Sequence, residues 1–422
     1  MNQNQLFNLT NNNIRQNEKI VVFGVGGGGG NALNHIIESG VQGVDFVAAN
    51  TDARALDMSQ APNKIILGEA LTRGLGAGAN PQVGANAAKE SIDRIKEYIT
   101  GSDMLFVTAG MGGGTGTGAA PVIAETAKDM GVLVVGVVTK PFGFEMGKRM
   151  HTAEEGIAQL KKNVDALLIV ENDRLLQMEN GMKIKIVDAY KKVDEVLRQA
   201  VQGVTDLITK NGFINLDFAD IKAVLTDAGT AIMGMGEGEG EDRAIKAAKN
   251  AITSPLMTFP VTGAKGILLN VTTGSEIMLG EMSDAAKIIE ETADPDAQVI
   301  WGHVIDESLG DKVHVTLIAT FPDDGKVRKP ISKPEQTQEK VQPRAAQPQQ
   351  PVQQQRSNIV QPQQPSRVNS LYDSYTKKRR AQEGGLEEAR LTSPANDDYS
   401  VFPGFQRKPY DQPALFRKNL KD

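Results

Sequence analysis

The sequence predicts a parallel, doubly wound α/β domain that is followed by a long helix and a smaller α+β domain. Three observations support this fold class. Between Ile20 and Val170, short runs rich in Val, Ile and Leu alternate with helix-compatible segments. Two of these apolar runs are followed directly by glycine-rich turns. Further along the chain, apolar residues recur at helical spacing for more than twenty positions.

The parallel sheet is predicted from five apolar segments of strand length. They are continuous runs rather than alternating ones, which is typical of strands that are covered on both faces. The segments are Lys19–Phe23, Val44–Asn50, Asp103–Thr108, Leu133–Val138 and Ala166–Val170. Ligands of such sheets bind beyond the carboxyl ends of the strands, so we expect a cleft at that edge.

Glycine-rich turns follow the first and third of these segments, at Gly24–Asn31 and Gly110–Gly118. A backbone without Cβ atoms can point several N–H groups at one anion, and the positive end of the following helix helps to hold it. Both turns and the segment Asn50–Asp52 should lie at the same edge of the sheet. The sequence therefore predicts one nucleotide that is held by two phosphate-binding turns.

A long helix is predicted from Ile186 to Thr209, before Gly212 ends the apolar pattern. Its length would be about 35 Å at 1.5 Å per residue. The smaller domain beyond it combines strand-like and helix-like segments. Strands are predicted at Gly266–Thr273, Gln298–Ile305 and Lys312–Phe321, and helices at Asp242–Ile252 and Asp284–Thr292.

The composition narrows the class of protein. The 422 residues are 40% hydrophobic, include no cysteine and carry a formal net charge of −6. The lack of cysteine excludes disulfides and thiolate metal sites and suits a reducing compartment. The sequence shows no signal peptide and no apolar stretch of membrane-spanning length, so we expect a cytoplasmic protein without direct membrane insertion. The negative net charge gives no electrostatic reason to expect a nucleic-acid partner.

The composition changes abruptly after Pro322. The segment Pro330–Pro365 contains 12 Gln and 7 Pro, and no aromatic residue occurs between Phe321 and Tyr372, so a packed core cannot form there. The chain ends in an apolar segment whose two halves resemble each other, Phe402–Lys408 and Gln412–Lys418. We interpret this end as a short linear binding motif on a long tether.

The first turn alone is also compatible with a dinucleotide-binding enzyme. A Rossmann dehydrogenase is one alternative, because Asp52 stands about twenty residues beyond the turn, where a ribose-binding acid would lie. The second turn has no place in that fingerprint, and no obvious catalytic Lys, His or Cys constellation serves hydride transfer. A Walker P-loop is excluded because the chain contains no Gly-Lys-Ser/Thr sequence.

The run Gly112–Gly118 resembles the glycine motif of the tubulin superfamily, and its surroundings resemble the bacterial cell-division GTPases of the FtsZ family. The likeness covers about residues 18–321 in consistent order. Its other matching motifs are Gly24–Asn31, Asn50–Asp52, Gly74–Pro81, Thr139–Phe142 with Glu145 and Arg149, Asn172–Asp173 and Asn215–Asp220. The resemblance implies a tubulin-like, Rossmann-type GTPase domain that binds GTP or GDP with Mg²⁺, and K⁺ is a further candidate cation.

The resemblance also implies a role for individual residues around the nucleotide. The phosphates would be held by Gly26, Gly27, Gly28, Gly112, Gly113, Gly114, Thr115, Gly116 and Thr117. The terminal phosphate and its magnesium would be flanked by Asp52 and Gly78, and the ribose side by Glu145 and Arg149. The base would stack on Tyr190, be selected by Asp194, and be enclosed by Asn31 and Asn172.

Three further polar residues, Asn215, Asp217 and Asp220, follow the long helix and should therefore lie at the face opposite the cleft. In the resembled family this loop enters the nucleotide pocket of the next subunit, where the carboxylates orient the attacking water. The resemblance thus implies a head-to-tail homopolymer whose assembly drives hydrolysis. Asp217 can also cap a helix that starts near Phe218. The two aspartates argue against the second alternative, a filament protein that has lost catalysis.

The C-terminal end resembles the peptide with which this family binds membrane-tethering and regulatory division proteins. The implied contacts are Asp411, Pro413, Leu415, Phe416 and Arg417, although Gln412 stands where an aliphatic residue is usual. The protein would then act at the division ring in mid-cell. The predicted organisation is an N-terminal extension at 1–18, a GTP-binding domain at 19–185, the helix at 186–210, an α+β domain with the catalytic loop at 211–322, a linker at 323–396 and the peptide at 397–422.

Overall fold

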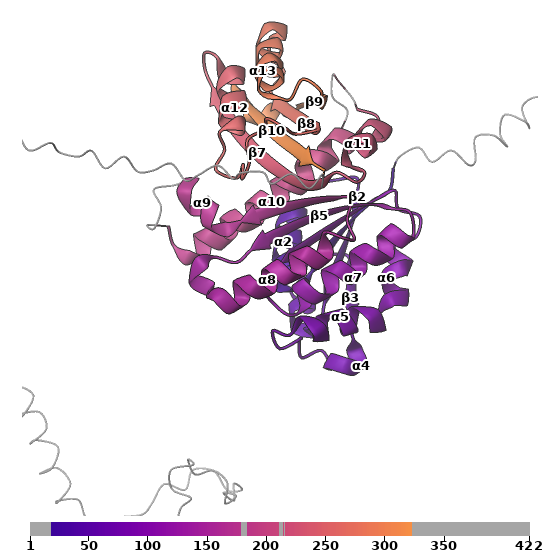
Figure 1. Cartoon of the computed structure of the whole chain (residues 1–422). Helices are drawn as coiled ribbons and strands as arrows, with labels where there is room; N and C mark the ends of the chain where they lie inside the picture. The colour runs from indigo at the N-terminus through magenta and orange to yellow at the C-terminus, as the bar shows by residue number, and fades with distance from the viewer. Residues whose placement is uncertain (1–17, 179–183, 211–213, 215, 323–422) are drawn as a thin grey trace, which may run out of the picture. The chain divides into compact units, whose positions relative to one another are not determined.

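The computed structural model describes residues 18–178, 184–210, 214 and 216–322 (Figure 1). The predicted N-terminal extension up to residue 17, the linker, the C-terminal peptide with its contacts at 411–417, and Asn215 lie outside the described residues. The predicted domain boundaries stay a prediction. In the described part, a single sheet runs through both halves of the chain.

Within the described residues, the sheet contains ten strands in the order β3-β2-β1-β4-β5-β6-β7-β10-β8-β9. The strands from β3 to β7 run parallel, β10 is antiparallel to both of its neighbours, and β9 is parallel to β8. The strands are β1 (Ile20–Val25), β2 (Val44–Asn50), β3 (Asn63–Ile66), β4 (Met104–Gly110), β5 (Leu133–Lys140), β6 (Ala166–Glu171), β7 (Gly229–Glu239), β8 (Gly266–Thr273), β9 (Gln298–Ile305) and β10 (Lys312–Phe321).

Helices connect and cover these strands. They are α2 (Gly26–Glu38), α3 (Ala53–Asp57), α4 (Glu69–Thr72), α5 (Pro81–Glu90), α6 (Ile92–Ile99), α7 (Thr115–Asp129), α8 (Gly147–Leu160), α9 (Asn172–Met178), α10 (Ile186–Thr209), α11 (Phe218–Leu225), α12 (Arg243–Ile252) and α13 (Leu279–Thr292), with short 3₁₀ turns η1 (Gly143–Glu145) and η3 (Glu307–Leu309). The mixed α/β fold class is confirmed. The strands β3 and β7 were not predicted, and α13 begins before the predicted Asp284.

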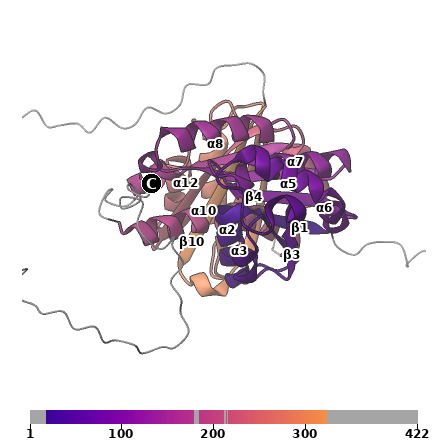
Figure 2. The same ribbon diagram turned by 90° about the horizontal axis from the view of Figure 1, so that it is seen from below.

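The first half is layered because its strands are apolar on both faces. In β1, the side chains of Ile20 and Val22 face one core and those of Val21 and Phe23 face another, as the two-residue period of a strand requires. The first core is completed by α2 and α10, and the second by α5, α6, α7 and α8. In Figure 2, α7 and α8 accordingly lie on the side of the sheet opposite α2 and α3.

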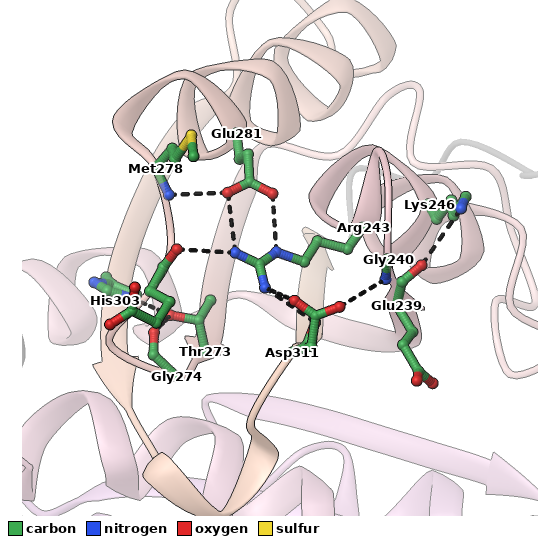
Figure 3. A network of polar contacts seen from close by, with 11 residues as sticks. Glu239, Gly240, Arg243, Lys246, Thr273, Gly274, Met278, Glu281, His303 and Asp311 are labelled. Carbon is green, nitrogen blue, oxygen red and sulfur yellow. Dashed lines mark hydrogen bonds and ion pairs between the residues drawn. The ribbon is translucent and has the colours of Figure 1, made fainter.

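The second half has a core of its own, in which α12 and α13 pack on the β7–β10 strands. The buried Arg243 at the start of α12 connects this helix to α13 and to the residue before β10 (Figure 3). Its Nε and one terminal nitrogen donate to the Glu281 carboxylate at 2.9 and 3.1 Å, and its other terminal nitrogen donates to the Asp311 carboxylate and carbonyl. The guanidinium holds the pKa of Glu281 below its ordinary value. A buried charge with this many partners fixes the start of α13 against α12 and β10.

The long helix α10 connects the two halves. It buries Val193, Leu197 and Val201 in the first core and contacts α2 as well as β8 and β9. Its far end reaches the amino end of β2, where a Cβ on Gly43 would lie only 2.8 Å from Cγ2 of Thr209. The helix therefore runs from the carboxyl edge of the parallel sheet to its amino edge.

Candidate active site

Both glycine-rich turns lie at the point where the order of the parallel strands reverses. The strands β1 and β4 are neighbours, and the chain proceeds from β1 to β2 on one side and from β4 to β5 on the other. This switch point is where open α/β sheets bind their ligands. The first turn differs from the prediction, because β1 ends at Val25 and α2 begins directly at Gly26. Gly26–Gly30 thus form the first turns of a helix rather than a separate loop.

The two glycine turns pack backbone against backbone. A Cβ on Gly26, whose φ is +72°, would lie 2.7 Å from the Gly116 nitrogen, and a Cβ on Gly28 would lie 3.1 Å from the Gly110 Cα. In contrast, a Cβ on Gly27, Gly30 or Gly113 would meet open space. Gly27, Gly30 and the exposed Asn31 belong to the lining of a cavity of about 180 Å³. The glycines therefore bring the two turns together and leave room beside them.

A third loop, residues 73–80 between α4 and α5, closes against the second turn. Asp52 caps α3 by accepting a hydrogen bond from the Arg54 N–H at 3.0 Å, and its backbone pairs with that of Leu75. The following residues reach the second turn, since a Cβ on Gly114 would lie 2.9 Å from Cβ of Ala77. Gly78 lies in this loop with a φ of +57° and open space around it. The structure therefore brings Asp52 and Gly78 to the same edge as the glycine turns.

The two threonines of the second turn differ in their surroundings. Thr117 is buried, and its hydroxyl accepts a hydrogen bond from the Gly112 N–H at 2.9 Å, so it stabilises its own turn. Thr115 is half-buried at the start of α7, and its hydroxyl lies 2.6 Å from that of Thr51. Thr51 belongs to the recognised segment Asn50–Asp52, but the sequence assigned it no role.

The predicted ribose-side residues form one group beside the second turn. Glu145 and Arg149 make an ion pair of 2.9 Å, and a Cβ on Gly112 would lie 2.7 Å from the Arg149 carbonyl oxygen. The Tyr190 hydroxyl interacts with Glu145, and burial followed by the Glu145 charge raises the pKa of that tyrosine. Phe142, which the sequence left without a role, packs edge-on against the Tyr190 ring at 5.4 Å.

The remaining predicted base contacts supply hydrogen-bond acceptors. Asn172 is buried at the start of α9, and its side-chain oxygen has no hydrogen-bond partner among the described residues. Asp194 lies one helical turn after Tyr190 on α10, and burial raises the pKa of its carboxyl to about 6 in spite of the nearby His35. His35 lies one turn beyond Asn31 on α2 and pairs with Glu195 at 2.9 Å. These acceptors suit a base that presents N–H donors.

Asp217 and Asp220 are separated from all of these residues. They lie around the start of α11, beyond the end of α10 that packs on Gly43, and both side chains are exposed. Figure 1 shows α9 and α11 at opposite ends of α10. Asp217 occupies the N-cap position as predicted, but its side chain makes no capping hydrogen bond. The 24 residues of α10 span about 36 Å at 1.5 Å per residue.

A second cavity of about 590 Å³ lies away from the glycine turns. It is lined by α10 and by strands of the second half, including Gln202, Met235 and Asn270. Neither turn contributes to it. We therefore place the candidate active site at the switch point and not in this larger cavity.

The described residues contain neither a cluster of metal ligands nor a membrane-spanning helix. Within residues 18–178, 184–210, 214 and 216–322, no group of three or more His, Asp or Glu side chains has an arrangement that could hold a metal ion. In the same part of the chain, no helix has the length and apolarity to span a membrane.

The strand order and the paired glycine turns define the class: the first half is a nucleotide-binding domain of the tubulin type. Residues 19–180 match the Tubulin/FtsZ family, GTPase domain, and residues 229–322 match the FtsZ family, C-terminal domain. The chain belongs to the FtsZ family of GTPases. This membership excludes the dehydrogenase alternative.

Solved structures agree with this assignment. An FtsZ dimer from M. jannaschii is 42% identical, with a TM-score of 0.70 over 76% of this chain and 92% of that one. A single-substitution mutant of FtsZ from the same organism is 43% identical, with a TM-score of 0.71 over 75% and 94%. CetZ2 from Haloferax volcanii, solved as a GTPγS-bound protofilament, is 21% identical with a TM-score of 0.60 over 71% and 92%, and shows likeness of fold alone.

Proposed function

We propose that this GTPase assembles head to tail into protofilaments and hydrolyses GTP at the contact between subunits. One observation carries the proposal: the glycine turns and the pair Asp217 and Asp220 lie at opposite ends of α10. The carboxylates of one chain cannot reach its own turns across about 36 Å of helix. A second copy in the same orientation supplies them, and a contact between unlike surfaces that does not close produces a filament.

Exposed apolar side chains at both ends support such a contact. Phe144 and Met146, beside the ribose-side group, are 55% and 77% exposed. At the other end, Ile214 is 38% exposed and its backbone pairs with that of His303. Exposed apolar residues that gather near a functional site are typical of a surface that another protein covers. Self-association also occurs among the similar structures, since the M. jannaschii FtsZ was solved as a dimer and CetZ2 as a protofilament.

The residues at the switch point fit a guanine nucleotide. The N–H groups of Gly26, Gly27, Gly28 and of Gly113–Gly116 would hold the phosphates, whereas Gly112, whose N–H donates to Thr117, would shape the turn. The unpaired oxygen of Asn172 offers an acceptor to a base donor. Asp194 would accept from the same edge of guanine, Asn31 would border it and Tyr190 would stack on the ring. Glu145 and Arg149 would contact the ribose and phosphate side.

The residues present also fit a magnesium ion that is held mainly by phosphate oxygens and water. Mg²⁺ retains several waters in such sites, and Asp52 with the loop around Gly78 offers oxygen atoms beside the second turn. The ion would neutralise charge on the phosphates when bound, and K⁺ is a further candidate counter-ion. Asp217 and Asp220 of the next subunit would orient the attacking water, and Asn215 belongs to the same proposed set.

The biological role proposed for these filaments is the bacterial division ring at mid-cell, in the cytoplasm, where they organise septum formation. Membrane-tethering and regulatory proteins would bind the C-terminal peptide through Asp411, Pro413, Leu415, Phe416 and Arg417. Deletion of residues 398–422 should leave GTPase activity and polymer mass unchanged and abolish recruitment of filaments to the division site. Recruitment that survives the deletion would reject this role for the peptide.

The experiment that tests the proposed function measures GTP hydrolysis against protein concentration while light scattering reports assembly. A specific activity that rises from near zero above a critical concentration, together with scattering, would support a site shared between subunits. Activity that is independent of concentration would show a self-contained site and contradict the proposal.

A further inference from the structure

Thr51 joins three segments of the candidate site. It follows β2, its side chain is fully buried, and its hydroxyl lies 2.6 Å from the hydroxyl of Thr115 at the start of α7. Its carbonyl oxygen accepts a hydrogen bond from the Gly76 N–H at 3.0 Å, and the backbone of the next residue, Asp52, pairs with that of Leu75. The end of β2, the third loop and the second glycine turn therefore meet at Thr51.

The hydrogen-bond capacity of the two hydroxyls gives this contact a direction. Each threonine hydroxyl has one proton to donate and can accept further bonds. Within the described part of the chain, Thr115 is the hydrogen-bond partner that the Thr51 hydroxyl has, and a buried O–H without an acceptor is unfavourable. Thr51 therefore donates to Thr115. The proton of the half-buried Thr115 hydroxyl is then directed away from Thr51 and is free to meet a ligand.

We propose that Thr51 is a positioning residue that fixes the Thr115 hydroxyl as a donor to the terminal phosphoryl group of GTP, and so favours GTP over GDP. The inference rests on the proposed placement of the phosphates at the second turn. Successive hydrogen bonds polarise one another, so a chain from Thr51 through Thr115 to a charged oxygen is stronger than its separate links. The third loop, which would flank the terminal phosphate, is held by the carbonyl of the same residue.

The test compares variants that differ in one hydroxyl. Thr51→Val removes the hydroxyl and keeps the shape, whereas Thr51→Ser keeps the hydroxyl. Thr126→Val is the matched control. Thr126 is buried like Thr51, but it lies in α7, and its hydroxyl donates to the Val122 carbonyl of the same helix. Dissociation constants for GDP and for a non-hydrolysable GTP analogue are measured below the assembly concentration, with thermal melting of each variant.

Thr51→Val should weaken binding of the GTP analogue about fivefold, the size expected when one neutral hydrogen bond is lost and the Thr115 hydroxyl is no longer held as a donor, and that of GDP less than about twofold. Thr51→Ser and Thr126→Val should change neither constant by more than about twofold. An unchanged ratio of the two constants in Thr51→Val, or equal loss in Thr51→Ser, would overturn the inference. If Thr51→Val does not fold, Thr51→Ala compared with Thr51→Ser carries the same test.

The outcomes separate this inference from the proposed function. A wild-type chain that binds both nucleotides, with an unchanged ratio in the variant, rejects the role of Thr51 alone. A wild-type chain that binds neither nucleotide rejects the placement of the phosphates, and the inference with it.

Discussion

The nucleotide cleft depends, at the scale of single residues, on side chains that are missing. Gly26 and Gly28 permit the two turns to touch, while Gly27, Gly30 and Gly113 leave space for a ligand. The glycine pattern predicted both turns. It could not predict that the first one is already helical, because glycine in an isolated sequence is as compatible with a loop as with the tightly packed start of α2.

Contacts between single residues that are far apart in the chain could not be predicted from the sequence. The pairing of Thr51 with Thr115 and the packing of Phe142 on Tyr190 join residues that are far apart in the chain. Neither contact leaves a periodic pattern. The roles of Tyr190 and Asp194 came only from the family resemblance, because an aromatic residue and a carboxylate one turn apart on a helix are otherwise typical of packing and a solvated face.

Asp220→Ala should reduce GTP turnover by about a hundredfold, as expected when a group that orients the attacking water is lost, and should leave GTP binding within about twofold. The exposed Asp220 lies in the first turn of α11, whose N-cap position is occupied by Asp217, so its loss leaves the N-cap residue in place. Steady-state phosphate release and equilibrium binding of GTP measure the two effects.

Asp93→Ala is the matched control, because Asp93 is an exposed aspartate in the first turn of α6. It should retain both activities. Loss of GTP binding in the Asp220 variant would show that this residue belongs to the pocket of its own subunit.

The affinity for GDP should fall below pH 6. Asp194 loses its charge there, because burial raises the pKa of its carboxyl to about 6, and a protonated carboxyl accepts less well from the N–H groups of guanine. One required deprotonation predicts a loss of up to about tenfold per pH unit below that value. Because the folded-state pKa lies above the ordinary one, the contribution of this group to stability is also lost as pH rises through about 6.

Titration of GDP binding between pH 5 and 8 measures this effect, and Asp194→Asn is the comparison. The variant should bind GDP more weakly at pH 7.5 and lose the part of the pH dependence that Asp194 causes. Identical pH profiles for the two proteins would contradict the assignment of Asp194 to the base.

At the scale of elements, the sequence predicted those that carry a strong apolar pattern. The five predicted parallel strands, α10 and the three predicted strands of the second half are present. The strand β7 was missed because it contains glycines at alternate positions, Gly234, Gly236 and Gly238, and glycine disfavours strands. The structure explains them: a Cβ at these positions would lie 1.9 to 2.1 Å from carbonyl oxygens of α12. The recurrence of glycine at every second position was the sequence signal that could have indicated this strand.

Gly236→Ala should destabilise the protein by about 1–3 kcal/mol, the usual cost of overpacking, because its Cβ would lie 2.0 Å from the Ala247 carbonyl oxygen. Gly280→Ala is the control, since Gly280 is also a glycine of the second half but lies in α13 with open space around it. It should stabilise the protein by roughly 0.5–1 kcal/mol. Urea unfolding of the GDP-bound proteins measures both values, and an equal effect of the two substitutions would show that β7 and α12 are not in close contact.

At the scale of the whole molecule, the described chain is organised around α10 and one continuous sheet. The joint between the halves of the sheet is short, because β7 pairs with β6 over only Gly229–Ala231. The division into domains stays a prediction, but the pairing of β6 with β7 could not be predicted, because strand pairing between distant segments leaves no local pattern. The sequence did predict that the carboxylates after α10 lie away from the cleft, because the length of a helix follows from its residue count.

The most direct test of a shared active site is to mix two inactive variants. Gly27→Val should block nucleotide binding, because its side chain would enter the cavity without meeting other protein atoms, and Asp220→Ala should lack the catalytic carboxylate. An equimolar mixture brings intact pockets of the second variant against intact catalytic residues of the first. Random head-to-tail pairing predicts recovery of about a quarter of the wild-type GTPase activity.

Each variant alone should be nearly inactive, and co-sedimentation of a labelled variant with its partner confirms that the two assemble together. Recovered activity in the mixture would establish that Asp220 acts on the nucleotide of a neighbouring subunit. A co-assembled mixture that is no more active than the sum of its parts would contradict the account and place the complete active site within one chain.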